Sequence, residues 1–471
     1  MDSVRFSSHT MGLYLNLFMS FVYLANQYVV APTSGQYAKL LGMTPAMGGI
    51  IIGLCPAAAL VSSLFYSMWS NVSFKQPILM CIVCGILGNL SYAMALQYNS
   101  PFLILMGRLL TGFGGPRVIT RRYIADHVPQ DRRLLASSQF VTVSAMGLAC
   151  GPLISSLVAR DRDMAILWYQ TETAPGWIMA VLWLLALVVT IVYFHEPEQQ
   201  QGSSKNTFRT PSPINLNPSN NNVFNLTSDK MEHAIPDEHT GLLGSSTHSY
   251  HSSGSLSPTR NNAYLSIEDE PPFWEYLSME VLVILLIYTV NKTGQELVIS
   301  SIPVITLQEF DWTAEGGGYY MAIVGASVLP MILAMSYFMQ DSEEREMVLQ
   351  LTYTCIIFLC MLLHFTIFGD YTILQYVIGS AMLFACLNTL EGVIMTLLSK
   401  LISPELAKGT FNSGLLATEA GTFGRVIGDF CITFFGASHN PTILVNTLFL
   451  PLVLMMLLTL GLIHYYYDRL I

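Results

Sequence analysis

Charged side chains lie inside stretches of this sequence that are otherwise apolar. Arg117 and Arg121 belong to one such stretch, Lys292 and Glu296 to a second, and Glu391 to a third. An ionisable side chain within a lipid bilayer costs at least about 2.5 kcal/mol, so it usually faces a cavity or an oppositely charged partner. These residues are therefore candidates for holding a negatively charged solute and for carrying or relaying protons.

Other charged residues share the same stretches, and two interpretations remain open for them. They are Arg108, Arg122, Glu419, Arg425 and Asp429. Lys292 and Glu296 are one helical turn apart, and so are Arg425 and Asp429, so each pair could simply neutralise itself within one helix. We favour internal pairing for Arg425 with Asp429. The functional interpretation is favoured for four residues, namely Arg117, Arg121, Lys292 and Glu391.

The composition predicts an all-α membrane protein with about twelve transmembrane helices. The chain has 471 residues, of which 52% are hydrophobic and 11% charged, whereas a soluble domain carries about a quarter charged residues. Apolar runs long enough to cross a bilayer recur along it. We place them near 11–31, 45–68, 77–98, 101–125, 136–159, 175–195, 277–305, 317–338, 347–368, 372–400, 409–436 and 441–467. We interpret the first as a retained helix rather than a signal peptide.

The distribution of basic residues predicts that both termini are cytosolic. An even number of helices puts the two ends on one side, and most of the connections on that side are basic, with Lys75, Arg345 and Lys400 among them. The predicted organisation is a cytosolic N-terminus (1–10), a six-helix bundle (11–195), a linker (196–272), a second six-helix bundle (273–467) and a cytosolic tail (468–471).

The predicted linker is rich in Ser, Asn, Pro, Thr and His and should be disordered. Glu238 precedes the pair Leu242 and Leu243 by four positions, which is the form of a dileucine sorting signal. Such signals direct membrane proteins to endosomes, lysosomes or vacuoles, and a clathrin adaptor could reach this one in an exposed linker. Short patterns of this kind also occur by chance.

Several function classes are disfavoured by the sequence. All eight cysteines fall inside predicted helices, where they most often pack as small apolar residues, so we expect no metal and no disulfide framework. The net charge of −10 is not that of a nucleic-acid-binding protein. No nucleophile–base pair or nucleotide loop has adequate context, so we expect neither an enzyme nor a cofactor.

The two halves of the chain repeat each other. The segment 28–33 is matched by 300–306, and 124–129 is matched by 400–404. Aligning Pro129 with Pro404 puts Glu391 beside Arg117, at corresponding depths of the two halves. Two similar halves joined by a long loop are the plan of major facilitator transporters, which bind substrate near the midplane between the halves. Neutral donors could come from the first helix, namely Tyr23, Asn26, Gln27 and Tyr28.

Longer motifs make the resemblance to major facilitators more specific. Residues 107–114 resemble the fourth-helix motif of major facilitators, and the Gly147, Gly151 and Pro152 set resembles their fifth-helix motif. Residues 117–129 and 408–427 are similar to vacuolar phosphate transporters that carry an SPX domain fused to a major facilitator unit. Because the sequence starts almost at the first helix, we expect SPX regulation to be absent or supplied elsewhere. Lysosomal major facilitators, one of them linked to chloride conduction, share Trp69, Ser70 and Asn71.

The resemblance implies a secondary-active transporter that moves inorganic phosphate or a similar anion across a vacuolar or lysosomal membrane by alternating access. The expected substrate-binding residues are Arg117, Arg121, Lys292, Tyr23 and Asn26, and the expected proton-coupling or gating residues are Glu391, Glu296, Arg108 and Glu419. Two alternatives remain open: an endolysosomal pathway for chloride or organic anions, and a non-transporting sensor or scaffold in the membrane.

Overall fold

The described part of the chain is helical and contains no β-strand. The computed structural model describes residues 2–44, 47–160, 170–196, 277–338, 343–365, 371–402, 413–436 and 441–470. The first half contains α1 (Asp2–Tyr28), η1 (Ala31–Thr33), α2 (Ser34–Leu40), α3 (Met47–Trp69), α4 (Lys75–Met94), α5 (Pro101–Phe113), α6 (Arg117–His127), α7 (Gln130–Arg160) and α8 (Ala174–Tyr193). The second contains α9 (Met279–Phe310), α10 (Ala314–Phe338), α11 (Glu344–Leu362), α12 (Ile373–Leu401), α13 (Ser413–Phe435), α14 (Pro441–Tyr466) and η4 (Tyr467–Arg469).

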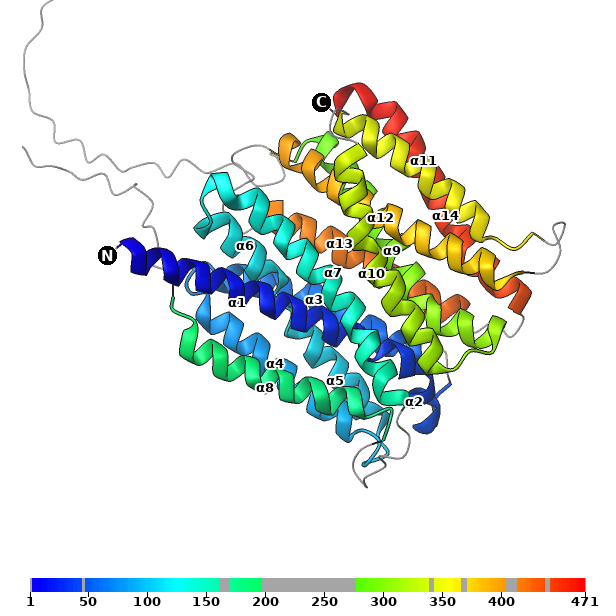
Figure 1. The fold of residues 1–471 in the computed structure, drawn as a ribbon, viewed down its shortest axis with the longest axis horizontal. Helices are drawn as coiled ribbons and strands as arrows, with labels where there is room; N and C mark the ends of the chain where they lie inside the picture. Colours follow the sequence, from blue (N-terminus) through cyan, green and yellow to red (C-terminus); the bar gives the residue numbers. More distant parts are fainter. Residues whose placement is uncertain are drawn as a thin grey trace, which may run out of the picture. The chain divides into compact units, whose positions relative to one another are not determined.

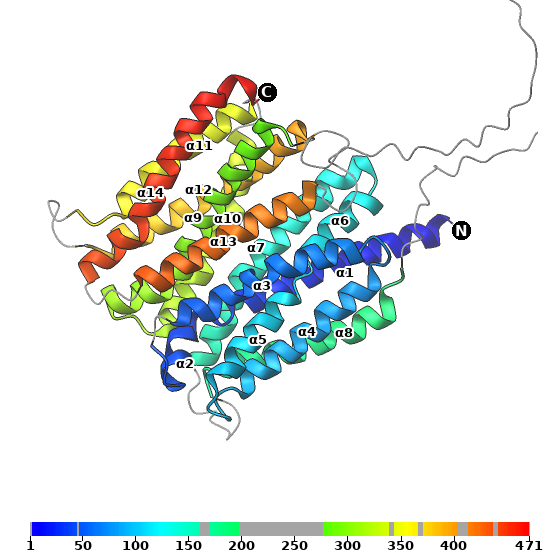
Figure 2. The same cartoon turned by 180° about the vertical axis from the view of Figure 1, so that it is seen from behind.

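The helices of each half lie together (Figure 1). The blue-to-green helices α1 to α8 form one bundle and the yellow-green-to-red helices α9 to α14 form the other, as the view from behind also shows (Figure 2). The first helix begins and the last helix ends on the same side of the bundles. We call this the terminal side, and the other the opposite side.

The described helices form twelve membrane crossings. Ten described segments are long and apolar enough to span a membrane, among them 11–40, which joins α1 to α2, and 101–127, which joins α5 to α6. The other two crossings are α10 and α13, and α13 carries three charged residues, Glu419, Arg425 and Asp429. The prediction of an all-α membrane protein with about twelve helices in two six-helix halves is confirmed.

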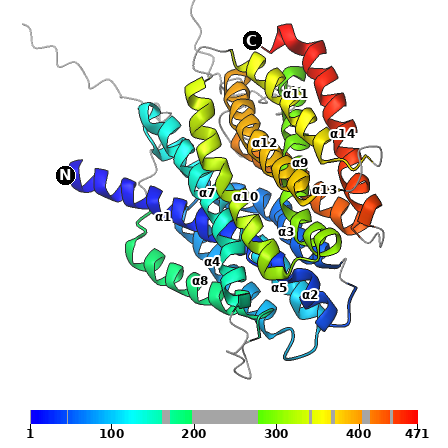
Figure 3. The same cartoon turned by 45° about the vertical axis from the view of Figure 1, so that its right-hand side comes forward.

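Two pairs of helices form most of the boundary between the halves. The first pair is α3 with α13 and the second is α7 with α10 (Figure 3). The most enclosed helix is α9, in which 83% of the apolar stretch is buried, against 33% in α8 and α11. Charged groups on α9 are therefore shielded from lipid, whereas α8 and α11 present most of their surface outward.

The fourth predicted helix is interrupted, which corrects the expectation of one continuous span over 101–125. It ends at Phe113 and resumes at Arg117, with Gly114, Gly115 and Pro116 between. Proline lacks a backbone N–H and disfavours helical geometry at the preceding residue. Gly114 also packs closely on α4, since a β-carbon there would lie 2.6 Å from the Cys81 carbonyl oxygen. Non-helical backbone at this depth is tolerated because it is enclosed by protein.

A methyl group at Gly112 is expected to destabilise the fold. Its β-carbon would overlap the Cys55 carbonyl of α3, whereas nothing lies within 4 Å of the corresponding position at Gly461. Overpacking costs about 1 to 3 kcal/mol, and alanine in an unhindered helical site gains about 1 kcal/mol over glycine. Gly112→Ala should therefore lower the midpoint of thermal unfolding in detergent and Gly461→Ala should not. Equal midpoints for the two variants would contradict the close α3–α5 packing.

The predicted linker and its sorting signal cannot be compared with the structure. Residues 197–276, which include Glu238, Leu242 and Leu243, lie outside the described residues.

Candidate functional site

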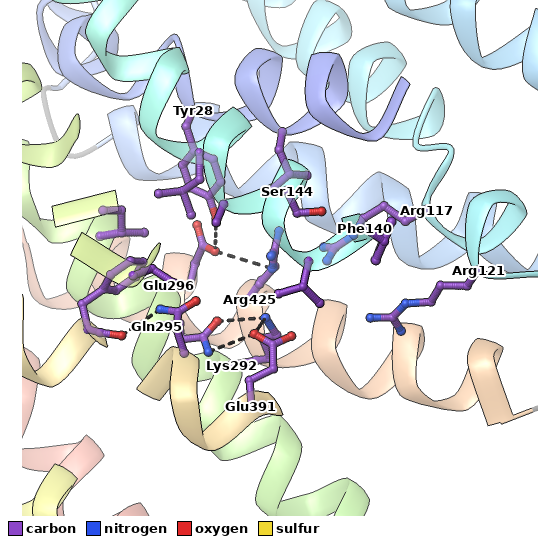
Figure 4. Close-up of a pocket in the computed structure, with 18 residues that line it drawn as sticks. Tyr28, Arg117, Arg121, Phe140, Ser144, Lys292, Gln295, Glu296, Glu391 and Arg425 are labelled. Carbon is purple, nitrogen blue, oxygen red and sulfur yellow. Dashed lines mark hydrogen bonds and ion pairs between the residues drawn. The ribbon is translucent and has the colours of Figure 1, made fainter. Parts of the chain in front are cut away.

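A cavity of about 50 Å³ lies between the two halves. Its walls come from α1, α6 and α7 of the first half and from α9, α10, α12 and α13 of the second. Holding one water requires about 10 to 15 Å³, so the cavity has room for a few waters or one small solute. Most of its charged side chains point toward one another (Figure 4).

An ion pair between two helices of the second half forms one wall. The Nζ atom of Lys292 on α9 lies 2.5 Å from Oε2 of Glu391 on α12 and donates to Oε1 of Gln295 at 2.8 Å. Gln295 also donates to Oε2 of Glu391 at 3.1 Å, and the Tyr288 hydroxyl donates to Oε1 at 3.0 Å. Glu391 thus accepts three hydrogen bonds, which hold its carboxylate in a fixed position.

A second carboxylate links the two halves. Glu296 on α9 accepts a hydrogen bond of 2.7 Å from the Tyr28 hydroxyl on α1 and one of 2.9 Å from Ser300. Its Oε2 also lies 3.9 Å from Nε of Arg425, whose Nη1 donates to the Gln27 side chain at 3.3 Å. The carboxylate partners of Lys292 and Arg425 therefore lie on other helices. Among the described residues, neither the Lys292–Glu296 nor the Arg425–Asp429 pairing forms.

Arg117 and Arg121 of α6 make fewer hydrogen bonds and ion pairs with described residues than Lys292 and Arg425 do. Arg121 donates to the Thr418 hydroxyl at 2.9 Å, and its guanidinium carbon lies 5.6 Å from the centre of the Phe140 ring. Arg117 lines the cavity but makes no hydrogen bond or ion pair with any described residue, and its buried Nε atom has no acceptor. A buried donor without an acceptor is costly, so the Nε–H group of Arg117 is available to an acceptor that enters the cavity.

The charges around the cavity do not balance. Its described lining includes four cationic side chains and two carboxylates, which leaves an excess of two positive charges. The cations are Arg117, Arg121, Lys292 and Arg425, and the carboxylates are Glu296 and Glu391. Coulomb interactions are stronger in a space shielded from bulk water. The arrangement is therefore suited to a small solute with negative charge.

Four residues predicted for the site lie outside the cavity wall. Three of them are deeply buried, and the fourth, Glu419, lies between α3 and α13. Arg108 is 1% exposed and donates to the backbone carbonyls of Ile51, Asn26 and Gln27, at 2.9, 3.3 and 3.0 Å. Two of these carbonyls belong to the last turn of α1, where helical partners are missing. Tyr23 is buried with its hydroxyl 3.8 Å from the Cys55 sulfur. The Asn26 side chain is fully buried and has no partner among the described residues.

Contacts between the halves lie on both sides of the cavity. On the terminal side, Glu419 of α13 accepts a short hydrogen bond from Ser63 of α3, in addition to the Arg121–Thr418 contact. On the opposite side, a β-carbon at Gly49 would lie 2.5 Å from the Thr433 hydroxyl oxygen. Glu419 thus lies at the edge of the boundary between the halves rather than in the cavity.

Sequence reasoning undervalued Arg425 and Tyr28, which both line the cavity. Arg425 lies on one face of α13 with Thr418, Thr422 and Asp429, because these residues follow one another at helical spacing. The i, i+4 spacing of Arg425 and Asp429 nevertheless favoured an internal pair. The competing acceptors, Gln27 and Glu296, lie on other helices and are far away in the sequence.

Comparison with known proteins identifies the fold. Residues 17–429 match the model of the Major Facilitator Superfamily. This chain belongs to that superfamily. As a major facilitator it is a multi-pass membrane protein of a transporter family, and the cavity between its halves lies where such proteins bind substrate.

The relatives of this major facilitator include SPX domain-containing membrane proteins of plants. One from Arabidopsis thaliana is 35% identical over 473 residues, covering 98% of this chain. One from Oryza sativa subsp. indica is 33% identical over 435 residues, covering 91% of this chain. The chain spans 64% and 60% of the lengths of these two relatives.

Solved structures support the same fold. A bacterial homologue of the human lysosomal transporter Spinster, in an inward-facing and occupied conformation, superposes with a TM-score of 0.60 at 12% identity, covering 98% of this chain and 96% of the homologue. The nucleoside transporter NupG superposes with a TM-score of 0.61 at 13% identity, covering 97% of this chain and 99% of NupG. At these identities the comparison concerns the fold alone.

Proposed function

We propose that this major facilitator is a secondary-active transporter that moves inorganic phosphate, or a similar small anion, by alternating access. The observation that carries the proposal is the excess of two positive charges around the cavity, together with the absence of any described partner for Arg117. A cation in a membrane protein is costly unless a solute or a partner compensates it. An anion that enters the cavity supplies this compensation.

Phosphate suits the chemical groups of the cavity. A guanidinium such as that of Arg117 can donate two parallel hydrogen bonds to one oxyanion, and the Lys292 ammonium adds a point charge. The volume of about 50 Å³ favours a small anion over a bulky organic one in this conformation. We assign Arg117, Arg121 and Lys292 to anion binding, with Tyr28 and Arg425 as neighbouring donors. Glu391 and Glu296 are the proposed gating carboxylates.

The proposed cycle exchanges the contacts that hold the halves together. Access from the terminal side requires the Arg121–Thr418 and Ser63–Glu419 contacts to break. Access from the opposite side requires α3 and α13 to separate near Gly49 and Thr433. Rocking of one half against the other alternates the two openings around the bound anion.

We further propose a vacuolar, lysosomal or endosomal location with both termini in the cytosol. The support for it is the dileucine-type signal of Glu238, Leu242 and Leu243, together with the basic residues on the terminal side, such as Lys75 and Lys400. A clathrin adaptor is the proposed partner of this signal. Deletion of 200–270 should then missort the protein without abolishing its flux.

Anion flux in one reconstituted preparation tests the proposed function. Proteoliposomes containing the full chain would be assayed for flux of phosphate, sulfate, nitrate and chloride, with empty liposomes as the control. We expect uptake of labelled phosphate that excess unlabelled phosphate inhibits. Chloride current without phosphate flux would instead support a chloride pathway, which the small cavity also accommodates. Absence of flux for all four anions would contradict the proposal.

A further inference from the structure

The ion pair of Lys292 and Glu391 leaves one donor and one acceptor unused among the described residues (Figure 4). The Lys292 ammonium has three N–H groups, and two of them donate to Glu391 and Gln295. The ionised carboxylate of Glu391 has about four acceptor positions. Hydrogen bonds from Lys292, Gln295 and Tyr288 occupy three of them. One N–H group and one acceptor position therefore remain for a bound solute.

Glu391 is the carboxylate that is more open to the cavity. Glu391 and Glu296 both line it, but the Glu391 side chain is 13% exposed and the Glu296 side chain only 1%. Tyr28 donates to one oxygen of Glu296 and Ser300 to the other. A solute in the cavity therefore reaches the unused acceptor position of Glu391 more easily than either oxygen of Glu296.

An anion cannot use the remaining Lys292 donor without approaching Glu391. The Nζ atom of Lys292 lies 2.5 Å from Oε2 of Glu391. A charge-assisted N–H···O bond is about 2.8 Å long, so an anion oxygen that accepts from Lys292 lies within about 5 Å of Oε2. The cavity of about 50 Å³ leaves such an anion little freedom to turn away. The anion is therefore placed beside a carboxylate, and like charges at this separation disfavour each other.

An anion that brings its own proton converts this repulsion into a hydrogen bond. The P–O–H group of hydrogenphosphate can donate to Glu391 while another of its oxygens accepts from Lys292. Hydrogen bonds of the O–H···O⁻ type are about twice as strong as those between neutral groups. Sulfate has the same tetrahedral shape but no proton at neutral pH, so its oxygens can only repel the Glu391 carboxylate.

We propose that Glu391 selects an oxyanion that keeps a hydroxyl group at neutral pH, by accepting a hydrogen bond from that hydroxyl. The inference rests on the proposed anion transport and adds selectivity to the gating role of Glu391. The ligand class contains phosphate and arsenate and excludes sulfate. Hydrogenphosphate also balances the excess of two positive charges around the cavity. Sulfate is divalent as well, so the hydroxyl group and not the charge separates the two anions.

Competition binding tests the role of the hydroxyl group. Labelled phosphate bound to the full chain in detergent would be displaced by unlabelled phosphate, arsenate, sulfate or fluorophosphate. Fluorophosphate is a divalent anion in which fluorine replaces the hydroxyl group of hydrogenphosphate, so it removes this one donor. We expect arsenate to act within about threefold of phosphate, and sulfate and fluorophosphate to require about tenfold higher concentrations or more. Displacement by fluorophosphate at the same concentration as phosphate would overturn the proposal.

The variant Glu391→Gln tests whether this residue is the acceptor. Its amide oxygen can still accept from Lys292 and Gln295, while its NH₂ group supplies a donor where the carboxylate had an unused acceptor position. Sulfate and fluorophosphate should then displace phosphate within about threefold of unlabelled phosphate. The matched control is Glu344→Gln in the surface pair of Glu344 and Lys400, which should keep the wild-type preference. A wild-type preference in Glu391→Gln would exclude Glu391 as the acceptor.

Failure of this inference is distinguishable from failure of the proposed function. If the wild type binds none of the four anions, both fail. If it binds phosphate and fluorophosphate equally, the proposed function stands and the role of the hydroxyl group is wrong. The comparison of anions on the wild type needs no substitution, so it decides this point even if Glu391→Gln does not fold.

Discussion

Replacement of Arg117 by Gln is expected to lower phosphate uptake on the order of 100-fold without lowering thermal stability. A hydrogen bond to a charged group contributes about 1.5 to 3 kcal/mol, and each 1.4 kcal/mol is about tenfold in affinity. Loss of a two-bonded guanidinium contact therefore has a large effect on binding. Folding should not suffer, because Arg117 has no described partner that the substitution would leave unpaired.

Two further variants make this prediction specific. Arg117→Lys keeps the charge but not the planar pair of donors, so its uptake should fall between those of the wild type and Arg117→Gln. Arg345→Gln makes the same chemical change at an exposed Arg–Glu pair on the terminal side and should leave uptake unchanged. The measurements are initial rates of labelled phosphate uptake and midpoints of thermal unfolding. Undiminished uptake by Arg117→Gln would exclude Arg117 from the anion site.

Replacement of Lys292 by Gln is expected to reduce both stability and uptake. The substitution leaves the Glu391 carboxylate in the cavity wall without the ammonium that lies 2.5 Å from it. Removing one partner of a buried ion pair costs about 3 to 5 kcal/mol. We expect a lower midpoint of thermal unfolding, and a fall in phosphate uptake of at least tenfold.

The double variant Lys292→Gln with Glu391→Gln distinguishes a structural role from a binding role. It removes both charges of the pair, so the midpoint of unfolding should return toward the wild-type value. Uptake should remain low, because the cavity has lost a cation proposed to bind the anion and a carboxylate proposed to act in gating. If the double variant regains uptake together with stability, Lys292 serves only to neutralise Glu391.

The sequence was sufficient to predict the helices and the two halves, because both depend on local patterns. Apolar runs of bilayer length determine the spans, and the repeat of short motifs determines the pairing of the halves. The break between Phe113 and Arg117 was missed because glycines and a proline within a predicted span are also typical of close packing by one continuous helix. Close packing explains why glycine is needed at positions 112 and 114. The helix nevertheless does not continue through Pro116.

The partners of the charged residues could not be predicted from one sequence. Arg108 and Arg117 are both arginines of the same predicted helix, yet Arg108 donates to three backbone carbonyls and Arg117 has no acceptor among the described residues. The difference arises from the end of α1, which is remote in the sequence. Lys292 likewise pairs with Glu391 rather than with Glu296, because α12 packs on α9 and the side chain reaches across the interface.

The interruption between α5 and α6 has a mechanical consequence. Arg117 and Arg121 both belong to α6, a helix of only eleven residues. Gly114, Gly115 and Pro116 join α6 to α5. The N–H groups of Gly114 and Gly115 donate to Leu110 and Gly112, whereas Pro116 has no N–H to donate, so the regular main-chain ladder of the helix is interrupted at this joint. A slight rotation at the joint would swing both guanidinium groups while α5 keeps its place against α4. Movement of the short helix α6 alone would thus change the positions of the positive charges of the first half. No whole membrane-spanning helix would have to move.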